Sequence, residues 1–164
     1  MRRWRPAYVA LGSNLADPAV QVGAAIGRLP QIRATRLIAQ SRLWTSRPLG
    51  PRDQPDFVNA VVGLLTQLDA RELLGELQAL EAALGRTEPV VRWGPRIIDL
   101  DLLALGSEEL SEPGLRLPHP GVHERDFVLY PLAELAPELW IPGRGRVEAL
   151  VRRVANRGIV PLSK

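Results

Sequence analysis

Two aspartates, Asp99 and Asp101, stand one residue apart within an apolar run and are the residues of this chain best suited to chemistry. In an extended strand alternate side chains project from the same face, so the two carboxylates would lie roughly 7 Å apart on one side. Mg²⁺ takes oxygen ligands, commonly one or two carboxylates, and leaves its other positions to water and phosphate groups. The pair therefore predicts a site where two Mg²⁺ ions bridge a polyphosphate and neutralise charge that develops during transfer.

The residues around the acids leave a second interpretation open. Two neighbouring carboxylates repel each other and need compensating positive charge. Arg92 and Arg96 precede them in the turn Arg92-Trp93-Gly94-Pro95-Arg96, so the acids could instead form ion pairs on a solvated edge strand. We favour the metal site because apolar residues surround both acids. These are Ile97, Ile98, Leu102 and Leu103.

The composition excludes several other kinds of site. The 164 residues contain no cysteine, which excludes disulfides, a thiolate nucleophile and cysteine-ligated metal centres. No stretch is long and apolar enough for a signal peptide or a membrane span, so we expect a cytoplasmic protein with no membrane partner. We expect one domain, residues 1–164. The formal charge is +3 and nearly every cation is arginine, which binds phosphates bidentately and fits an anionic substrate.

The hydrophobic patterns place the acids in an α+β fold. Strands are expected at residues 8–11, 37–46 and 57–65 and around the two aspartates, with helices at 18–29 and 69–84. The order strand, helix, strand, strand, helix, strand is that of a ferredoxin-like fold. We therefore expect an antiparallel sheet with helices packed on it, followed by a C-terminal extension.

Local signals set the expected limits of these elements. Asp17 and Asp69 are the expected N-caps of the two helices. Residues 106–117 are polar and are expected to form a loop. Residues 125–135 are expected to form a helix that is interrupted near Pro131.

Other polar side chains stand where they could meet a ligand. Alternation places Phe57 and Asn59 on one face of their strand. A buried asparagine amide needs hydrogen-bond partners, either the edge of a heterocycle or a nearby loop. Gln78 and Glu81 lie at the edge of the leucine stripe of their helix and could face a site. His119 is fixed between two prolines.

Five motifs follow one another along nearly the whole chain. They are Leu11-Gly12-Ser13-Asn14-Leu15, Pro48-Leu49-Gly50 with Gln54-Pro55-Asp56-Phe57-Val58-Asn59, Glu81 with Gly85-Arg86, Trp93-Gly94-Pro95-Arg96-Ile97-Ile98-Asp99-Leu100-Asp101, and Pro118-His119-Pro120 with Arg125-Asp126-Phe127-Val128. In this order they resemble the 6-hydroxymethyl-7,8-dihydropterin pyrophosphokinase family of folate biosynthesis. The ordered set is far more specific than any one motif.

The resemblance implies a fold and an activity. Members of that family have a ferredoxin-like α+β fold, bind ATP and a reduced pterin, and transfer the diphosphate of ATP to the pterin's hydroxymethyl group, releasing AMP. We accordingly expect a monomeric ATP-dependent transferase with small-molecule substrates, no nucleic-acid partner and no fused second folate activity. No general base is expected, because charge neutralisation and in-line alignment carry such a transfer.

The resemblance also implies roles for individual residues. Asp99 and Asp101 correspond to the ligands of two Mg²⁺ ions. The residues implied to contact ATP are Arg86, Trp93, Arg96, His119 and Arg125, with Arg86 and Arg96 joining the two aspartates as catalytic groups. Gln78, from its position at the edge of its helix stripe, is a further expected ATP contact. The residues implied to contact the pterin are Phe57 and Phe127, which sandwich its ring, Asn59, which reads its edge, Ser46 and Leu49 through their backbone groups, and Trp93, in a closing loop.

The sequence departs from the family pattern in one place, and two other functions stay open. Glu88 and Pro89 stand where relatives carry basic residues, which would leave more of the phosphate contacts to Arg86. A nucleotidyltransferase could also use the two acids, and it would release pyrophosphate in place of AMP. An RNA-binding module could share the fold, but the eight aromatic residues form no basic-aromatic motif of the kind that such modules use.

Overall fold

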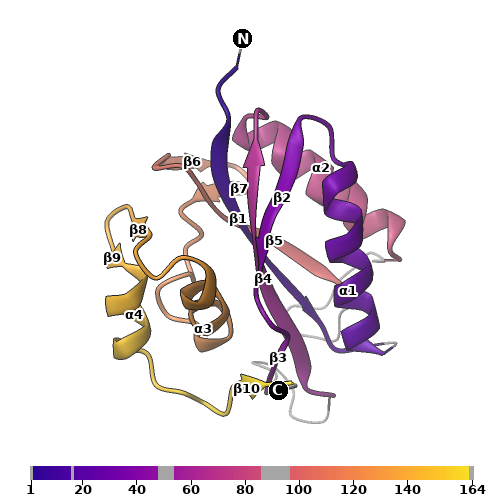
Figure 1. Cartoon of the computed structure of the whole chain (residues 1–164), viewed down its shortest axis with the longest axis vertical. Helices are drawn as coiled ribbons and strands as arrows, with labels where there is room; N and C mark the ends of the chain where they lie inside the picture. The colour runs from indigo at the N-terminus through magenta and orange to yellow at the C-terminus, as the bar shows by residue number, and fades with distance from the viewer. Residues whose placement is uncertain (1, 16, 48–53, 86–96, 163–164) are drawn as a thin grey trace.

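The computed structural model describes residues 2–15, 17–47, 54–85 and 97–162, and six strands in this part of the chain form one sheet (Figure 1). The strand order is β10-β3-β4-β1-β5, β2 also pairs with β4, and every pairing is antiparallel. The strands are β1 (Arg5–Ser13), β2 (Thr35–Gln40), β3 (Trp44–Ser46), β4 (Phe57–Thr66), β5 (Asp99–Leu105) and β10 (Val160–Pro161). Because β1 and β4 lie at the centre between their helix-linked partners, the predicted ferredoxin-like order is confirmed.

Helices cover both faces of the sheet (Figure 1). On the face that we call the first face lie α1 (Pro18–Arg28), followed by the short 3₁₀ helix η1 (Leu29–Gln31), and α2 (Ala70–Ala83). On the opposite, second face lie α3 (Asp126–Leu135) and α4 (Val147–Arg153). Two hydrophobic clusters result, one under each pair of helices. The C-terminal extension predicted from the sequence thus supplies the second layer.

Alternation along the strands assigns each residue to one of the two clusters. In β1, Val9 and Leu11 belong to the first-face cluster, whereas Tyr8 and Ala10 pack on the second-face cluster. Each fully buried aliphatic side chain contributes roughly 1.5–3 kcal/mol to stability. The central strands therefore hold both layers together.

The helix α2 begins and ends as its sequence predicts. Asp69 accepts a hydrogen bond from the backbone nitrogen of Glu72, and the Glu72 side chain accepts one from the Asp69 nitrogen, which forms a capping box. Gly85 follows the helix with a φ of +100°, a conformation that favours glycine. The cap expected at Asp17 is absent: Asp17 is left-handed, with φ 61°, and its side chain makes no capping bond, although Pro18 does begin the helix.

Three other local expectations are wrong. The long, partly irregular strand expected over residues 37–46 is two separate strands, because the Ser41 hydroxyl accepts a bond from the nitrogen of Val61 where backbone pairing would continue. The expected loop at 106–117 contains the hairpin of β6 (Leu110–Glu112) and β7 (Leu115–Leu117). Pro131 lies inside α3 without interrupting it and is buried there.

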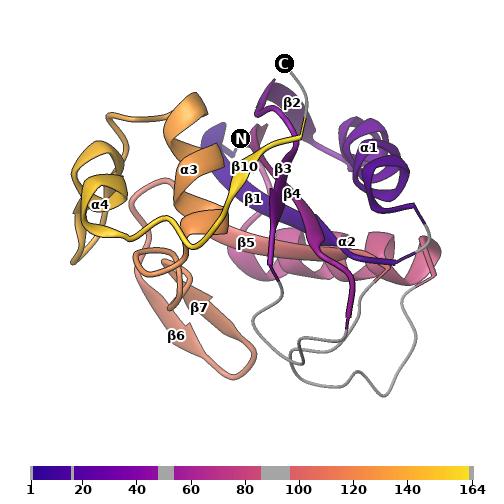
Figure 2. The ribbon, with the colours of Figure 1, turned by 90° about the horizontal axis from the view of Figure 1, so that it is seen from below.

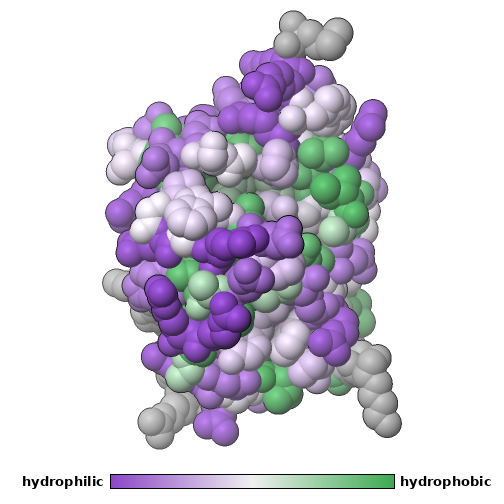
Figure 3. Space-filling model, turned by 60° about the vertical axis from the view of Figure 1, so that its left-hand side comes forward, coloured by the Kyte–Doolittle hydropathy of each residue, from purple (hydrophilic) through white to green (hydrophobic). Residues whose placement is uncertain are grey.

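The outermost layer of the second face is small and polar. A short hairpin of β8 (Trp140–Ile141) and β9 (Gly145–Arg146) leads into α4, which buries only Val147 and Leu150. The side of the molecule that includes α4 is mostly hydrophilic, with hydrophobic side chains in small separate groups (Figure 3). In a view from below, the chain then passes from α4 across α3 to β10, beside β3 (Figure 2).

Candidate active site

The two aspartates lie on the second face of the edge strand β5. Asp99 pairs with Gly12 and Asp101 with Ala10 of β1, while the intervening Leu100 is buried in the first-face cluster. The register shift between β1 and β5 falls farther along the strands, so alternation is regular here. Asp101 is exposed and Asp99 is partly exposed. The prediction that both acids share one face and meet solvent-accessible space is confirmed.

A row of register partners connects Asp99 to the centre of the sheet. Trp44 of β3 pairs with Asn59 of β4, Asn59 with Gly12 of β1, and Gly12 with Asp99. Gly12 keeps this row open, since a Cβ there would lie 3.4 Å from Asn59 Oδ1 and 3.6 Å from Phe57 Cδ1. Phe57 and Asn59 therefore flank a floor at Gly12 that leads to the acidic edge.

The amide of Asn59 has a fixed orientation. Its Nδ2 donates a hydrogen bond of 2.6 Å to the Ser46 hydroxyl, and both residues are buried. This bond uses one hydrogen of the amino group and fixes the amide so that Oδ1 lies toward Gly12, where it can accept a bond from a donor above the floor. Ser46, expected to act through its backbone, thus also acts through its side chain.

The start of α3 brings two more predicted residues to the second face. Phe127 is half-buried and packs against the second-face cluster. The guanidinium carbon of Arg125 lies 5.8 Å from the centre of the Phe127 ring. Arg125 also lies directly against the backbone of Gly121, where a Cβ would come within 2.6 Å of Nε. Glycine at that position therefore sets how close the guanidinium can approach the chain.

Hydrogen bonds of both its backbone and its ring hold His119 in place. Its backbone nitrogen donates to Leu103 of β5 at 2.9 Å, and its Nδ1 accepts from the nitrogen of Gly121 at 3.0 Å. Burial, and secondarily the positive charge of Arg125, lowers the pKa of His119 to about 4. At neutral pH the ring is therefore uncharged and carries its proton on Nε2, as a hydrogen-bond donor.

A pocket of about 330 Å³ lies at the free edge of β5, between α2 and β7. Its polar lining comes from Gln78, Glu81, Asp101, Arg116 and His119, and its apolar lining includes leucines of α2 and β5. Glu81 is buried and accepts a hydrogen bond of 2.7 Å from the nitrogen of Leu100, which fixes α2 to the strand. Asp101 thus lines the pocket and also shares a strand face with Asp99.

The described residues divide the predicted site into two connected parts. Gln78 and His119 lie at the pocket, whereas Phe57, Asn59 and Ser46 lie along the row on the second face. Four predicted residues, Leu49, Arg86, Trp93 and Arg96, lie outside the described residues, as do Glu88 and Pro89.

Sequence reasoning missed Gly12, Gly121 and Arg116 as parts of the site. The alternation Leu115-Arg116-Leu117, with buried leucines on either side, was the one local signal that Arg116 faces outward. In the described part of the chain, no group of three or more His, Cys, Asp or Glu residues could hold a metal ion. Among the described helices, none has the length and apolarity to cross a membrane.

The sequence was compared with known families and proteins. A family model described as 7,8-dihydro-6-hydroxymethylpterin-pyrophosphokinase matches residues 8–137. The 2-amino-4-hydroxy-6-hydroxymethyldihydropteridine pyrophosphokinase of Pseudomonas aeruginosa is 48% identical over 152 residues, which is 93% of each chain. The protein of the same name from Haemophilus influenzae is 42% identical over 157 residues, or 96% of this chain and 98% of that protein.

Solved structures show the same fold in a more distant protein. A crystal structure of Plasmodium falciparum HPPK-DHPS with pteroate matches with a TM-score of 0.74 at 14% sequence identity. The match covers 93% of this chain but only 43% of the Plasmodium chain. At that identity the likeness concerns the arrangement of strands and helices, which agrees with the α+β architecture described above.

Proposed function

This chain belongs to the 7,8-dihydro-6-hydroxymethylpterin-pyrophosphokinase family, and from that premise we propose how its residues carry out the reaction. The enzyme transfers diphosphate from ATP to the hydroxymethyl group of 6-hydroxymethyl-7,8-dihydropterin and releases AMP, a step of folate biosynthesis. The pterin oxygen forms a bond to the β-phosphorus, and the bond from that phosphorus to the oxygen of AMP breaks. The hydroxyl proton leaves to solvent.

The adenosine part of ATP would occupy the pocket beside β5. Its leucine lining suits a flat base, and the amide of Gln78 offers both a donor and an acceptor for a base edge. The Nε2 proton of His119 and the guanidinium of Arg116 offer donors to ribose or phosphate oxygens. His119 would bind as a neutral donor, so the cationic share of phosphate binding falls to arginines such as Arg125.

The pterin would lie on the floor over Gly12. Phe57 and Phe127 belong to the same side of the sheet and would stack on the two faces of the ring. Asn59 Oδ1 would accept a hydrogen bond from the ring's amino group, because the bond to Ser46 fixes the orientation of the amide and Oδ1 lies toward Gly12. This arrangement places the pterin next to Asp99 in the row across the sheet.

Asp99 and Asp101 would hold Mg²⁺ between the two substrates. The pair fits this ion, because Mg²⁺ is usually bound by one or two carboxylates together with substrate phosphates. Bound there, Mg²⁺ supplies charge neutralisation at the phosphate oxygens. His119, with a pKa of about 4, is too weak a base to take the hydroxyl proton at neutral pH. The described residues therefore act by positioning and electrostatics.

One observation carries this proposal: the row Asn59, Gly12 and Asp99 joins the predicted pterin contacts to an acidic edge that also lines the pocket. The test is incubation of the protein with ATP, Mg²⁺ and hydroxymethyldihydropterin, followed by identification of the nucleotide product. We expect AMP and a diphosphorylated pterin, and no turnover when the metal is chelated. Release of pyrophosphate would identify a nucleotidyltransferase and overturn the proposal.

Four further expectations remain proposals: two Mg²⁺ ions, a single domain, a monomer and a cytoplasmic location. The two-ion stoichiometry is supported by the pair of carboxylates on one strand face. It can be measured by titrating Mn²⁺ into the complex with a non-hydrolysable ATP analogue. The mass in solution, measured by light scattering, tests the monomer.

A further inference from the structure

The C-terminal segment 156–162, which we call the C-terminal strap, lies beyond the residues that the family model matches. Its first part is a turn closed by Asn156, whose side chain bonds both the nitrogen of Gly158 and the oxygen of Ile159. Its last part is β10. The strap contains Ile159, which is 1% exposed, so the segment is anchored in the interior and does not lie loosely on the surface.

One end of the strap is tied to α3. Asp126, the first residue of that helix, is 6% exposed, and its Oδ2 accepts a hydrogen bond of 2.8 Å from the backbone nitrogen of Arg157. Phe127, one wall of the proposed pterin slot, follows Asp126 directly in the sequence.

The other end of the strap is tied to β3. Val160 pairs with Thr45 and Pro161 with Trp44, and the nitrogen of Leu162 donates to the oxygen of Leu43 at 2.8 Å. Thr45 immediately precedes Ser46, whose hydroxyl holds the amide of Asn59. The strap therefore pairs with Thr45, the residue next to Ser46. Ser46 and Asn59 form the wall of the slot that is proposed to bond the edge of the pterin ring.

The middle of the strap touches the end of β3 as well. Gly158 has a φ of +110°, and a Cβ on it would lie 3.3 Å from Nε of Arg47. Arg47 follows Ser46, so the turn closely approaches the residue next to the slot. In the view from below, the C-terminal chain crosses from the start of α3 to β3 (Figure 2).

We propose that Asp126 is a positioning residue for pterin binding, and that through Asp126 the C-terminal strap fixes the aromatic wall at Phe127 relative to the wall at Ser46 and Asn59. The inference rests on the proposed position of the pterin between Phe57 and Phe127. A stacking slot binds a flat ring well only when its walls are held at one separation before the ring arrives, because ordering a wall on binding costs affinity. Pterin affinity should therefore depend on the strap much more than ATP affinity does, since the pocket proposed for ATP lies at β5, α2 and β7 and, of the residues proposed to bind ATP, only Arg125 lies next to Asp126 at the start of α3.

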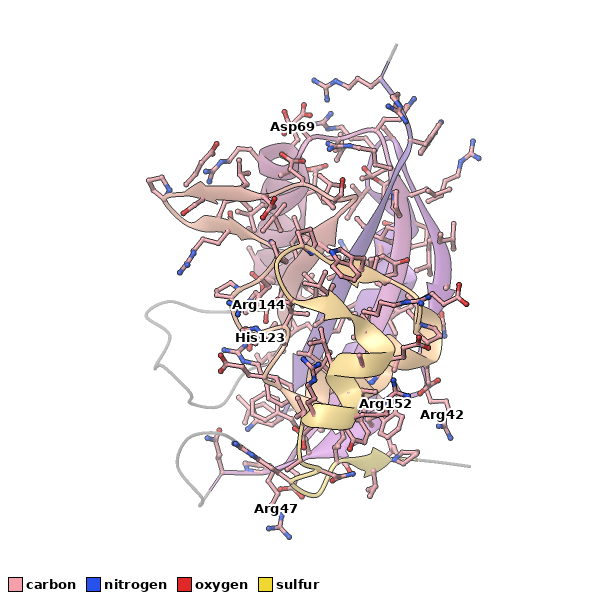
Figure 4. All side chains as sticks on the ribbon, turned by 90° about the vertical axis from the view of Figure 1, so that its left-hand side faces the viewer. Arg42, Arg47, Asp69, His123, Arg144 and Arg152 are labelled. Carbon is pink, nitrogen blue, oxygen red and sulfur yellow. The ribbon has the colours of Figure 1, made fainter. Side chains whose placement is uncertain are left out.

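The chain offers a matched control for Asp126. Asp69 is also an aspartate at the start of a helix, and its carboxylate accepts a backbone N–H bond of 2.8 Å from Glu72. Figure 4 places Asp69 at the opposite end of the molecule from Arg47, which lies beside the strap. Both Asp→Ala variants lose a carboxylate that accepts a bond from a backbone N–H, and with it some stability, but only one of them lies near the slot.

The experiment measures the dissociation constants of hydroxymethyldihydropterin and ATP by calorimetry, the KM for each substrate, kcat and Tm. The variants are Asp126→Ala, Asp126→Asn, Gly158→Val, Asp69→Ala and Phe127→Ala. We expect Asp126→Ala to raise the Kd and KM for the pterin about tenfold and to leave those for ATP within about twofold. Asp126→Asn keeps a neutral acceptor for Arg157 and should restore most of the affinity. Gly158→Val should resemble Asp126→Ala, and Asp69→Ala should lower Tm alone.

Two results would overturn the proposal while the slot itself stands: a pterin Kd that is unchanged in Asp126→Ala but raised in Phe127→Ala, or an equal rise in Asp126→Ala and Asp69→Ala. An unchanged pterin Kd in Phe127→Ala would overturn the proposed slot, and the strap's role with it. If Asp126→Ala does not fold, the outcome rests on Asp126→Asn and Gly158→Val, and wild-type pterin affinity in both would refute the inference.

Discussion

The two faces of the central strands differ most at the end of the sheet where the site lies. On the first face, Leu11 and Leu100 are buried side by side as register partners. One residue away on the second face, the corresponding partners are Gly12 and Asp99, which leave a floor and an acid. Because adjacent residues of a strand face opposite sides, the same segments carry stability on one face and chemistry on the other. Substitutions at neighbouring positions should therefore have different consequences.

The largest expected effect contrasts Asp101 with Leu100. Asp101→Ala, and equally Asp99→Ala, should lower the Mg²⁺-dependent rate about 100- to 1000-fold, because charge stabilisation at the phosphates is lost. Tm should change little, since Asp101 is exposed. Leu100→Ala should lower the free energy of unfolding by about 2–5 kcal/mol. Near-normal turnover in both aspartate variants would contradict the assignment of the two acids as metal ligands. Loss of the folded state in these variants would also contradict it, because the acids would then serve stability.

The next largest effect is expected at Gly12, the floor of the proposed pterin slot, and not elsewhere on the second face. A methyl group on Gly12 would stand 3.4 Å from Asn59 Oδ1, in the space proposed for the pterin. Gly12→Ala should therefore raise the Kd for the pterin about tenfold, measured by calorimetry, with little change for ATP.

A glycine farther along the sheet provides the control for that substitution. A Cβ added to Gly63 of β4 would make similar van der Waals contacts, at 3.5 Å from Tyr8 Cε1 and 3.7 Å from Ala39 Cβ. Gly63 lies away from the row of Asn59, Gly12 and Asp99. Gly63→Ala should leave binding of both substrates intact. Equal pterin affinity in the two variants would remove Gly12 from the site.

The contrast between the faces was largely predictable from sequence, because it depends on alternation alone. The pattern of residues 57–59 and 99–101 is sufficient to place Phe57 and Asn59 on one face and the two acids together. The start of α2 was equally local, since Asp69 and Glu72 form a capping box within four residues.

What could not be predicted depends on contacts between distant segments. The bond between Ser46 and Asn59 requires the register of β3 against β4, which no local pattern specifies. The end of β2 depends on Ser41 bonding Val61, twenty residues away. The hairpin at 110–117 carries few apolar residues, so its pairing gave only a weak signal. For the same reason Arg116 could not be assigned to the pocket.

The stability of the protein should depend on pH through His119, a residue of the candidate site. Its pKa is about 4 in the folded protein, against an ordinary value of 6.5, so between these two pH values the unfolded state binds more protons. Stability should therefore fall as pH drops from 6.5 to 4 and should then level off, by about 1–2 kcal/mol for this partly exposed ring. His119→Asn keeps an acceptor for Gly121 but does not titrate.

Denaturant unfolding of both proteins across that pH range isolates the contribution of His119. The difference between wild type and His119→Asn should change across the window and stay flat above pH 7. His123 and the carboxylates are present in both proteins and cancel in this comparison. A constant difference at all pH values would show that His119 is not held uncharged by its surroundings, and the proposal that it binds ATP as a neutral donor would fail.

The smallest expected effect concerns Arg116, which lines the ATP pocket from an exposed strand position. A solvent-accessible guanidinium gains little from one ion pair, roughly 0.2–1 kcal/mol, so Arg116→Ala should raise the KM for ATP only about threefold. The KM for the pterin and the value of kcat should not change, because the row over Gly12 is separate from the ATP pocket.

Arg71 is the control, since it lies on α2 but bonds Glu112 and Pro113 outside the pocket lining. Raising the salt concentration should weaken ATP binding less in Arg116→Ala than in Arg71→Ala, because only the former has lost a screened charge at the pocket. If both variants keep the wild-type KM and salt dependence, the pocket holds ATP without Arg116, and recognition on this side rests on Gln78, His119 and the apolar lining.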